Sequence, residues 1–280
     1  MKGTYHPPSM IAELEESARQ LRLVSLEMIY RRQAGHPGGS LSAAEIMAAL
    51  FFHQLRLDPQ RPGWPERDRF ILSKGHASAL LYAALSARGF FPASDLQRWG
   101  EIDCHLQGHP DRLKTPGVEM TSGTLGHGLP VGAGLALAAR LDGERHRIWA
   151  LLGDGECQAG IVWEAAMLAA KYRLAALTAI VDYNEVQLDG PVHEIMPLEP
   201  FADKWRAFGW AVLEINGHSM CQVLDALDAV EEIHDRPTVI IAHTTKGKGV
   251  SYMENDSRWH GQAPNAAQYA QAVAELNGGA

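Results

Sequence analysis

Two short apolar segments that end in polar residues constrain the fold of this chain most. Residues 148–152 run into a Gly-Asp-Gly motif at residues 153–155, and residues 177–181 run into Asp182 and Asn184. Continuously apolar segments of this length are typical of strands buried on both faces of a parallel sheet. In open α/β sheets, ligands bind beyond the carboxyl ends of such strands. We therefore expect a binding site where these two segments end.

Helices and strands alternate along the chain. The expected helices cover residues 11–30, 42–54, 77–88, 126–141, 161–172, 201–208 and 220–234. The expected strands cover residues 70–73, 148–152, 177–181, 210–215 and 238–243. The second helix is expected to begin with a capping box formed by Ser42 and Glu45. Alternation of this kind predicts an α/β fold, with a parallel sheet and helices on both faces.

No linker or repeat divides the chain, so residues 1–280 are expected to form a single domain. Residues 100–124 contain no periodic segment, and a loop of that length inside a compact domain is usually functional or disordered. Histidines and charged residues in this loop favour a functional role. Residues 265–280 are expected to be a polar tail.

Charge and cysteine content argue against several classes of protein to which the chain could belong. The net charge of −8 argues against nucleic acid as a partner, because binding to phosphate backbones requires a basic face. Cys104, Cys157 and Cys221 are widely separated and odd in number, which fits reduced thiols rather than a disulfide framework. The sequence contains no signal peptide and no apolar run long enough to span a membrane. A cytoplasmic protein without a membrane partner is expected.

Asp154 and Asn184 are hard oxygen donors at two strand ends, and such donors suit Mg²⁺ that also binds diphosphate oxygens. Gly153 and Gly155 lack side chains, so the backbone can approach a phosphate closely. A Gly-Asp-Gly motif alone is more often a simple turn. Its pairing with an asparagine 30 positions after Asp154 favours a site for Mg²⁺ and a diphosphate.

These features resemble the amino-terminal, diphosphate-binding part of transketolase, a thiamin-diphosphate-dependent enzyme, over nearly the whole chain. Besides residues 153–155 and Asn184, six further motifs match in the family's order. They are Gly35-His36-Pro37-Gly38-Gly39, Ser73-Lys74-Gly75-His76, Gln107-Gly108-His109-Pro110, Leu125-Gly126 with Gly128, Val162-Trp163-Glu164 and Trp259-His260-Gly261.

The resemblance implies that the chain binds thiamin diphosphate and Mg²⁺, with Ca²⁺ as a possible substitute. The implied metal ligands are the side chains of Asp154 and Asn184 and the carbonyl of Val186. The implied cofactor-binding residues are His76, Gly123, Leu125, Gly153, Gly155, Glu164, Asn184, Leu188 and His260. The implied catalytic residues are His36, His109 and His260, which would surround the sugar hydroxyls. The expected reaction transfers a two-carbon ketol unit from a ketose, free or phosphorylated, to an aldose.

The remaining histidines are interpreted differently. Six lie in polar surroundings without a motif and are expected at the surface: His6, His53, His146, His193, His218 and His234. His105 is expected to line or pack the long loop. His127 replaces a glutamine of the family's Leu-Gly-Gln-Gly motif. We hypothesise that it changes the number of groups in the site that can donate or accept a proton.

Transketolases continue into pyrimidine-binding and carboxyl-terminal domains that this sequence does not contain. We expect those domains on a separate partner subunit, in a heterotetramer of two such chains and two partners with sugar or sugar-phosphate substrates. Ala159 replaces a family glutamate that joins a carboxylate network between active sites, whereas Glu164 keeps the second position of that network. Communication between the active sites is therefore in question.

Three alternatives stay open. Half of a deoxyxylulose-phosphate synthase or part of a 2-oxo acid dehydrogenase would share the Gly-Asp-Gly motif, but would not be expected to carry all of the histidine loops. A non-catalytic paralogue that retains the cofactor site is the third, and Ala159 and the absent domains motivate it.

Overall fold

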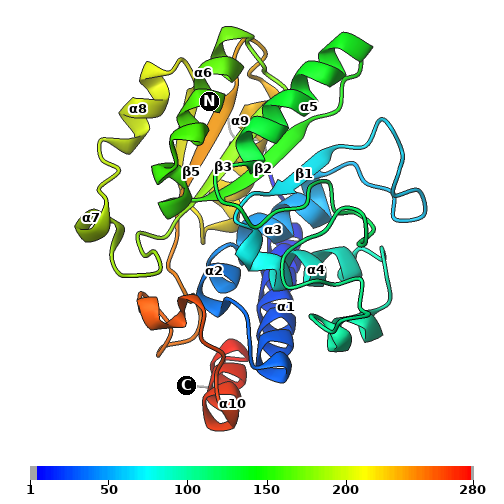
Figure 1. The fold of residues 1–280 in the computed structure, drawn as a ribbon, viewed down its shortest axis with the longest axis vertical. Helices are drawn as coiled ribbons and strands as arrows, with labels where there is room; N and C mark the ends of the chain where they lie inside the picture. The colour runs from blue at the N-terminus through cyan, green and yellow to red at the C-terminus, as the bar shows by residue number, and fades with distance from the viewer. Residues whose placement is uncertain (1–4, 279–280) are drawn as a thin grey trace.

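The computed structural model describes residues 5–278 and contains a five-stranded sheet with the strand order β1-β2-β3-β5-β4 (Figure 1). All four neighbouring pairs are parallel. The strands are β1 (Arg69–Leu72), β2 (Ile148–Gly153), β3 (Leu177–Tyr183), β4 (Ala211–Asn216) and β5 (Thr238–His243). The predicted parallel sheet is confirmed. Its central strand, β3, is buried along its whole length.

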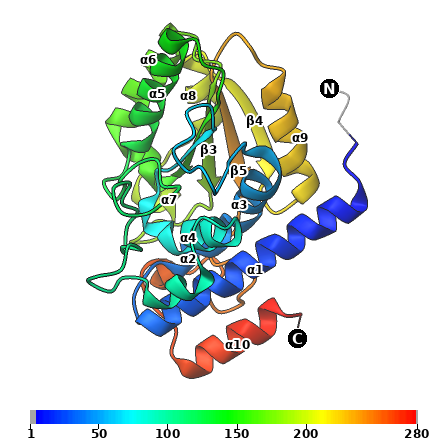
Figure 2. The ribbon, with the colours of Figure 1, turned by 90° about the vertical axis from the view of Figure 1, so that its right-hand side faces the viewer.

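Helices cover both faces of the sheet, as predicted. The α-helices are α1 (Pro8–Arg32), α2 (Pro37–Ser42), α3 (Ala44–Ala49), α4 (Ser78–Ala87), α5 (Gly128–Asp142), α6 (Gly160–Lys171), α7 (Val192–Ile195), α8 (Phe201–Ala207), α9 (Met220–Glu231) and α10 (Ala266–Leu276). Figure 2 shows α5 and α6 on one side of the sheet and α9 on the other.

The sheet separates two apolar cores because successive side chains of a strand point to opposite faces. Trp149 and Leu151 of β2 pack with α1, α3, α4 and α9. Ala150 and Leu152 of the same strand pack with α5, α6 and α8. Both faces of β2 are therefore buried, which explains why its sequence shows no alternation of apolar and polar residues.

The expected capping box at Ser42 is wrong. Ser42 is the last residue of α2, and α3 begins only at Ala44. The hydroxyl of Ser42 donates a hydrogen bond at 2.6 Å to Asp182 at the end of β3 instead. The helix expected over residues 42–54 also ends in a π-helical turn, Leu50–Gln54. The hydrogen bond from Ser42 to Asp182 thus forms in place of the predicted helix cap.

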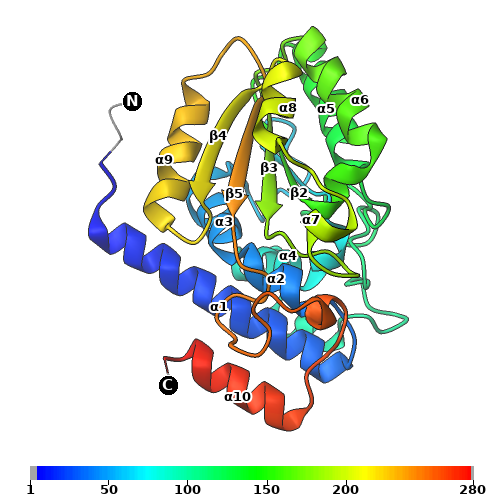
Figure 3. The ribbon, with the colours of Figure 1, turned by 90° about the vertical axis from the view of Figure 1, so that its left-hand side faces the viewer.

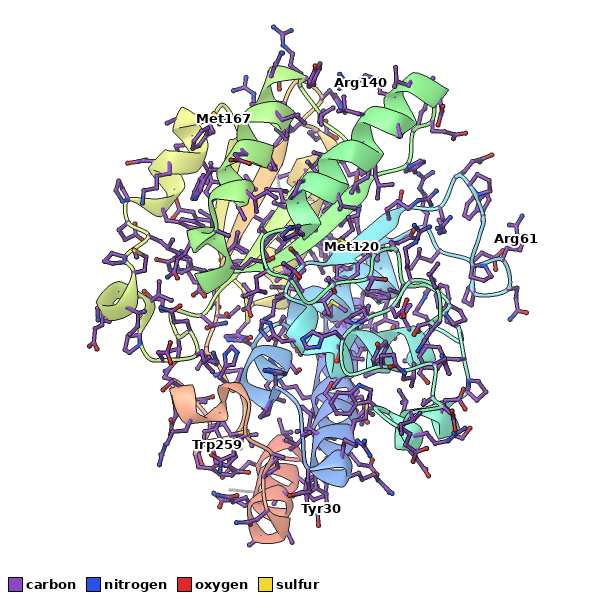
Figure 4. All side chains as sticks on the ribbon, in the orientation of Figure 1. Tyr30, Arg61, Met120, Arg140, Met167 and Trp259 are labelled. Atoms are coloured by element: carbon purple, nitrogen blue, oxygen red, sulfur yellow. The ribbon has the colours of Figure 1, made fainter. Side chains whose placement is uncertain are left out.

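The expected polar tail is also wrong, because residues 266–276 form α10. Asn265 and Gln268 make a capping box at its start. Leu276 packs with Leu26, Trp259 and other residues of a third apolar cluster. Figure 3 shows α10 beside α1, and Figure 4 labels Tyr30 and Trp259 at this end of the molecule. The last two residues of the expected tail, 279–280, lie outside the described residues.

Residues 100–124 contain neither a helix nor a strand, as expected. Single-turn 3₁₀ segments occupy Gly75–Ala77, Gly155–Gln158 and Ser257–His260, and a longer one occupies Ala93–Arg98. The first three each contain or adjoin a residue predicted for the site. Within the part of the chain that the structure describes, no helix is both long enough and apolar enough to cross a membrane.

Candidate functional site

A cavity of about 180 Å³ lies beyond the carboxyl ends of β2 and β3, where the sequence predicts a site. The strand register pairs Gly153 with Asp182, so the residues that follow both strands meet at this edge. Nine predicted site residues line the cavity: His76, Leu125, Gly153, Asp154, Gly155, Asn184, Val186, Leu188 and His260.

Asp154 connects the segments that follow β2 and β3. One carboxylate oxygen accepts a hydrogen bond from the Gly155 N–H at 2.6 Å, and the other accepts one from the Glu185 N–H at 2.5 Å. The side chain is buried. Burial and the neighbouring Asp182 carboxylate raise the pKa of Asp154 to about 6. A cation would offset the cost of holding this charge away from water.

Asp182 holds two residues of the cavity lining, Lys74 and Asn184, in place. It is fully buried and accepts hydrogen bonds from Lys74, Ser42, Thr244 and the Nδ2 of Asn184, the last at 3.0 Å. Burial opposes its ionisation, but the Lys74 ammonium and these donors outweigh burial and hold the pKa of Asp182 below its ordinary value. Asn184 donates its amide nitrogen to Asp182, and its amide oxygen accepts from the Val186 N–H at 3.2 Å, which leaves one lone pair of that oxygen for a metal.

Lys246 lies in the same cavity. Its buried ammonium donates to the carbonyl oxygen of Val186 at 2.6 Å and lies 2.8 Å from Nδ1 of His260. Burial and the positive charge of Lys74 lower the pKa of Lys246 to about 8. Since an ammonium only donates, Nδ1 of His260 accepts and the ring proton lies on Nε2.

Four of the predicted histidines form a cluster beside the cavity. The ring centroids of His36 lie 5.3 Å from His76, 5.3 Å from His260 and 6.2 Å from His109. Burial, with the nearby positive groups, lowers the pKa of His36 to about 4, that of His260 to about 3 and that of His76 well below its ordinary value. These three imidazoles are therefore neutral near pH 7 and can donate or accept a proton.

Comparison with known proteins identifies the family. The family model described as "Transketolase, thiamine diphosphate binding domain" matches residues 14–277. This chain belongs to the transketolase family. Its fold is accordingly that family's thiamin diphosphate-binding fold.

Curated transketolase relatives include short chains that are named as subunits. The chain is 43% identical over 265 residues to an apulose-4-phosphate transketolase subunit of Phocaeicola vulgatus, covering 95% of this chain and 93% of that one. It is 43% identical to the 6-deoxy-6-sulfo-D-fructose transketolase subunit SqwG of a Clostridium species, covering 94% and 96%.

Solved transketolases share the fold. The transketolase of Campylobacter jejuni superposes with a TM-score of 0.89 and 34% identity, and that of Pichia stipitis with 0.90 and 28%. These matches cover 94% of this chain but only 42% and 40% of the two transketolase chains. The chain thus spans less than half the length of those solved transketolases.

The residues at the cavity fit the thiamin diphosphate that the transketolase family implies. Nothing lies within 4 Å of where a Cβ on Gly153 would stand, so the backbone there is open to a ligand. Lys74 and Lys246 supply positive charge. The amide nitrogen of Gln187 is buried at the cavity and has no hydrogen-bond partner among residues 5–278, as expected of a donor whose acceptor is a ligand.

Other predicted residues lie outside this cavity. Gly123, at φ 147°, lies against His109, and both line a separate depression together with His127. Nδ1 of His127 lies 3.2 Å from the carbonyl oxygen of Leu125. Glu164 is exposed on α6, away from the cavity lining. The roles of these residues stay predictions.

Five residues of the cavity lining had no site role predicted from the sequence, although the first two lie in matched motifs: Gly39, Lys74, Glu156, Gln187 and Lys246. Buried Glu156 accepts hydrogen bonds from the N–H groups of Gly126 at 2.7 Å and Gly153 at 3.0 Å, and burial raises the pKa of its carboxyl. Lys74 and Lys246 follow β1 and β5 by two and three positions. A lysine just after a parallel strand is a signal that could have identified both.

Three of the histidines expected at the surface are not exposed. His146 is buried, and the side chains of His6 and His218 are only 8% and 15% exposed. Their polar sequence neighbours concealed tertiary packing. His53, His193 and His234 are exposed as expected. His105 packs the long loop against the segment that precedes it, because its ring lies against Phe91 and 3.1 Å from Asp95.

Proposed function

We propose that this chain is the cofactor-binding subunit of a split transketolase. It would transfer a two-carbon ketol unit from a ketose or ketose phosphate to an aldose or aldose phosphate. The observation that carries the proposal is the cluster of His36, His76 and His260, held neutral beside the cavity that contains the Gly-Asp-Gly motif. Relatives of similar length that are named as transketolase subunits support it.

In this proposal Asp154, Asn184 and the carbonyl of Val186 bind Mg²⁺, for which Ca²⁺ can substitute. A carboxylate, an amide oxygen and a carbonyl are hard ligands that leave metal positions for diphosphate oxygens. Among residues 5–278, no three or more His, Cys, Asp or Glu side chains are grouped to hold a metal. The proposed site therefore depends on this mixed set of ligands.

Bound thiamin diphosphate supplies the electron sink for breaking the carbon–carbon bond. The chain supplies binding, orientation and proton transfer. His260, with its proton on Nε2, can donate to a sugar hydroxyl, and neutral His36 and neighbouring His109 can exchange protons with the reacting hydroxyls. Lys74 and Lys246 offset the charge of the diphosphate.

A separate partner is proposed to complete the site. Leu125 and Leu188, expected to flank the cofactor rings, are 42% and 61% exposed. The cavity of about 180 Å³ is smaller than the ~300 Å³ at the lower end of ligand sites. Both features fit a cofactor held between two chains. We propose a heterotetramer of two such chains and two partners that carry the pyrimidine-binding domain, with Gly123 and Glu164 facing that interface.

The test is to co-purify the chain with its partner and to measure mass, binding of thiamin diphosphate with Mg²⁺, and ketol transfer across free and phosphorylated ketoses and aldoses. Transfer by the complex, and none by the 30.6 kDa chain alone, supports the proposal. Cofactor binding without transfer from any donor would favour a non-catalytic paralogue. A fully active isolated chain would contradict the split site.

A further inference from the structure

The turn between β4 and α9 packs closely against the segment that follows β5. The Gly217 N–H donates to the carbonyl oxygen of His243 at 2.8 Å. A Cβ on Gly217 would lie only 2.5 Å from Cγ2 of Thr244, so a residue without a side chain is needed there. This close approach brings the His218 imidazole to the backbone of Thr245, where 15% of the side chain stays exposed.

The partners of His218 define its tautomer. Nε2 lies 2.8 Å from the Thr245 nitrogen, and a backbone N–H can only donate, so Nε2 accepts. Nδ1 lies 3.1 Å from Oε2 of Glu45 and therefore carries the ring proton. The same oxygen accepts from Arg22 at 2.5 Å. The ring is thus held as the neutral Nδ1–H form between a carboxylate and a backbone donor.

The carboxyl of Glu45 is ionised and therefore accepts the hydrogen bond from this ring. The Glu45 side chain is 11% exposed, and that of Arg22 is 8% exposed. Burial opposes ionisation, but the hydrogen bond from His218 and the charge of Arg22 outweigh it and hold the pKa of Glu45 below its ordinary value. Arg22 also donates to the carbonyl of Leu41 at 3.0 Å, which ties the group to α2.

The segment that His218 holds is attached at four successive residues. Thr244 donates to Asp182, Thr245 donates to His218, and the Gly247 N–H donates to the carbonyl of Gly38 at 3.0 Å. Between them, Lys246 reaches the carbonyl of Val186 and Nδ1 of His260. The side chain of Lys246 therefore has its position set by the backbone on either side of it.

We infer that His218 is a positioning residue of the cofactor site, fixed by Glu45 and fixing Thr245 so that Lys246 stays against Val186 and His260. The inference rests on the proposed function, because the site concerned is the proposed cofactor site. A carbonyl oxygen has two lone pairs, so Lys246 can orient that of Val186 and still leave one for a metal. Outer hydrogen bonds of this kind orient the ligands that touch a metal.

Two substitutions separate the two hydrogen bonds of His218. His218→Asn keeps a donor near the position of Nδ1 but removes the acceptor for Thr245. His218→Gln keeps an acceptor near the position of Nε2. In the complex with the partner, His218→Asn should weaken binding of Mg²⁺ and thiamin diphosphate by roughly tenfold or more, and His218→Gln should restore most of that affinity.

His6→Asn is the matched control. Nε2 of His6 lies 3.1 Å from a carboxylate oxygen of Asp228 on α9, and the His6 side chain is 8% exposed, so His6 resembles His218 in its burial and in having a carboxylate neighbour. His6 is not among the residues that line the cavity. The His6→Asn substitution should lower thermal stability without changing cofactor affinity.

Amide hydrogen exchange at Thr245 provides a readout that needs no cofactor. Exchange should accelerate in His218→Asn and stay near the wild-type rate in His218→Gln. Equal cofactor affinity in wild type and His218→Asn, or unchanged Thr245 exchange, would overturn the inference. A wild-type complex that fails to bind thiamin diphosphate would instead overturn the proposed function, while the exchange result would still decide whether His218 fixes Thr245.

Discussion

The ammonium of Lys246 lies 2.8 Å from Nδ1 of His260 and thereby fixes the proton of that ring on Nε2. Lys246→Met keeps most of the side-chain volume and removes the charge. The pKa of His260 should then rise from about 3, yet stay below 6.5, because burial remains as its largest cause. Titration of the ring by NMR measures this shift.

Affinity for Mg²⁺ and thiamin diphosphate should fall in the same Lys246→Met variant, whereas stability should change little, since a buried charge is costly to hold. Lys248→Met is the control, because Lys248 lies two positions further on, is 39% exposed and pairs with Glu254 at 3.5 Å. An unchanged His260 pKa in Lys246→Met would contradict the assignment.

The strand ends were predictable because continuous apolar segments and a polar terminus are local signals. The positions of Asp154 and Asn184 follow from those strands and from the general behaviour of parallel sheets. The place of Lys246 three positions after β5 is a local signal of the same kind, but its contact with Val186 cannot be predicted from that signal. Lys246 reaches Val186 because β5 pairs with β3, although two helices, a strand and a third helix lie between these strands in the sequence. No spacing between residues in the sequence indicates the contact between Lys246 and Val186.

Ser42 and Asn265 show how a local signal competes with tertiary contacts. Both precede a residue three positions on that could complete a capping box. Asn265 makes the box with Gln268, but Ser42 donates to Asp182, 140 positions away. The spacing is the same, so only the proximity of a buried carboxylate to Ser42 distinguishes the outcomes.

Removing the cap of α10 should destabilise the protein modestly. Asn265→Ala deletes the side chain that accepts from the Gln268 N–H at 2.9 Å, and loss of such a cap costs about 1 kcal/mol in free energy of unfolding. Chemical denaturation measures the change. Gln271→Ala, on the same helix but away from its start, should cost less. Equal costs would mean that the capping box contributes nothing specific.

The half-buried imidazole of His36 predicts a pH dependence of stability. The pKa of His36 is about 4 in the folded chain against an ordinary 6.5, so the unfolded chain binds more protons between these values. The stability that neutral His36 contributes is thus fully present above pH 6.5 and is lost as the pH falls toward about 4. In His36→Gln the free energy of unfolding should fall less steeply over this window.

His53→Gln is the control for this pH experiment, because His53 is exposed on the π-helical turn, outside the cluster. It should leave the slope of unfolding free energy against pH close to that of the wild type. Denaturant titrations at several pH values give both slopes. A His36→Gln variant with the wild-type slope would show that another group causes the acid sensitivity.

Gln187 offers a test in which stability and binding change in opposite directions. Within the part of the chain that the structure describes, its buried amide nitrogen has no partner, and an unsatisfied donor costs about 1–3 kcal/mol. Gln187→Leu removes that donor, so the unfolding temperature of the cofactor-free chain should hold or rise. If the nitrogen donates to the diphosphate, affinity for thiamin diphosphate should fall roughly tenfold, the equivalent of about 1.4 kcal/mol.

Gln187→Glu should weaken affinity further than Gln187→Leu, because a carboxylate repels the diphosphate as well as lacking the donor. Gln158→Leu is the matched control, since the amide of Gln158 donates to the carbonyl of Met196 at 2.9 Å, outside the cavity lining. Calorimetric titration of the assembled complex ranks the variants. Equal affinities for wild type, Gln187→Leu and Gln187→Glu would place the diphosphate away from Gln187, and the buried donor would then be a cost of the fold alone.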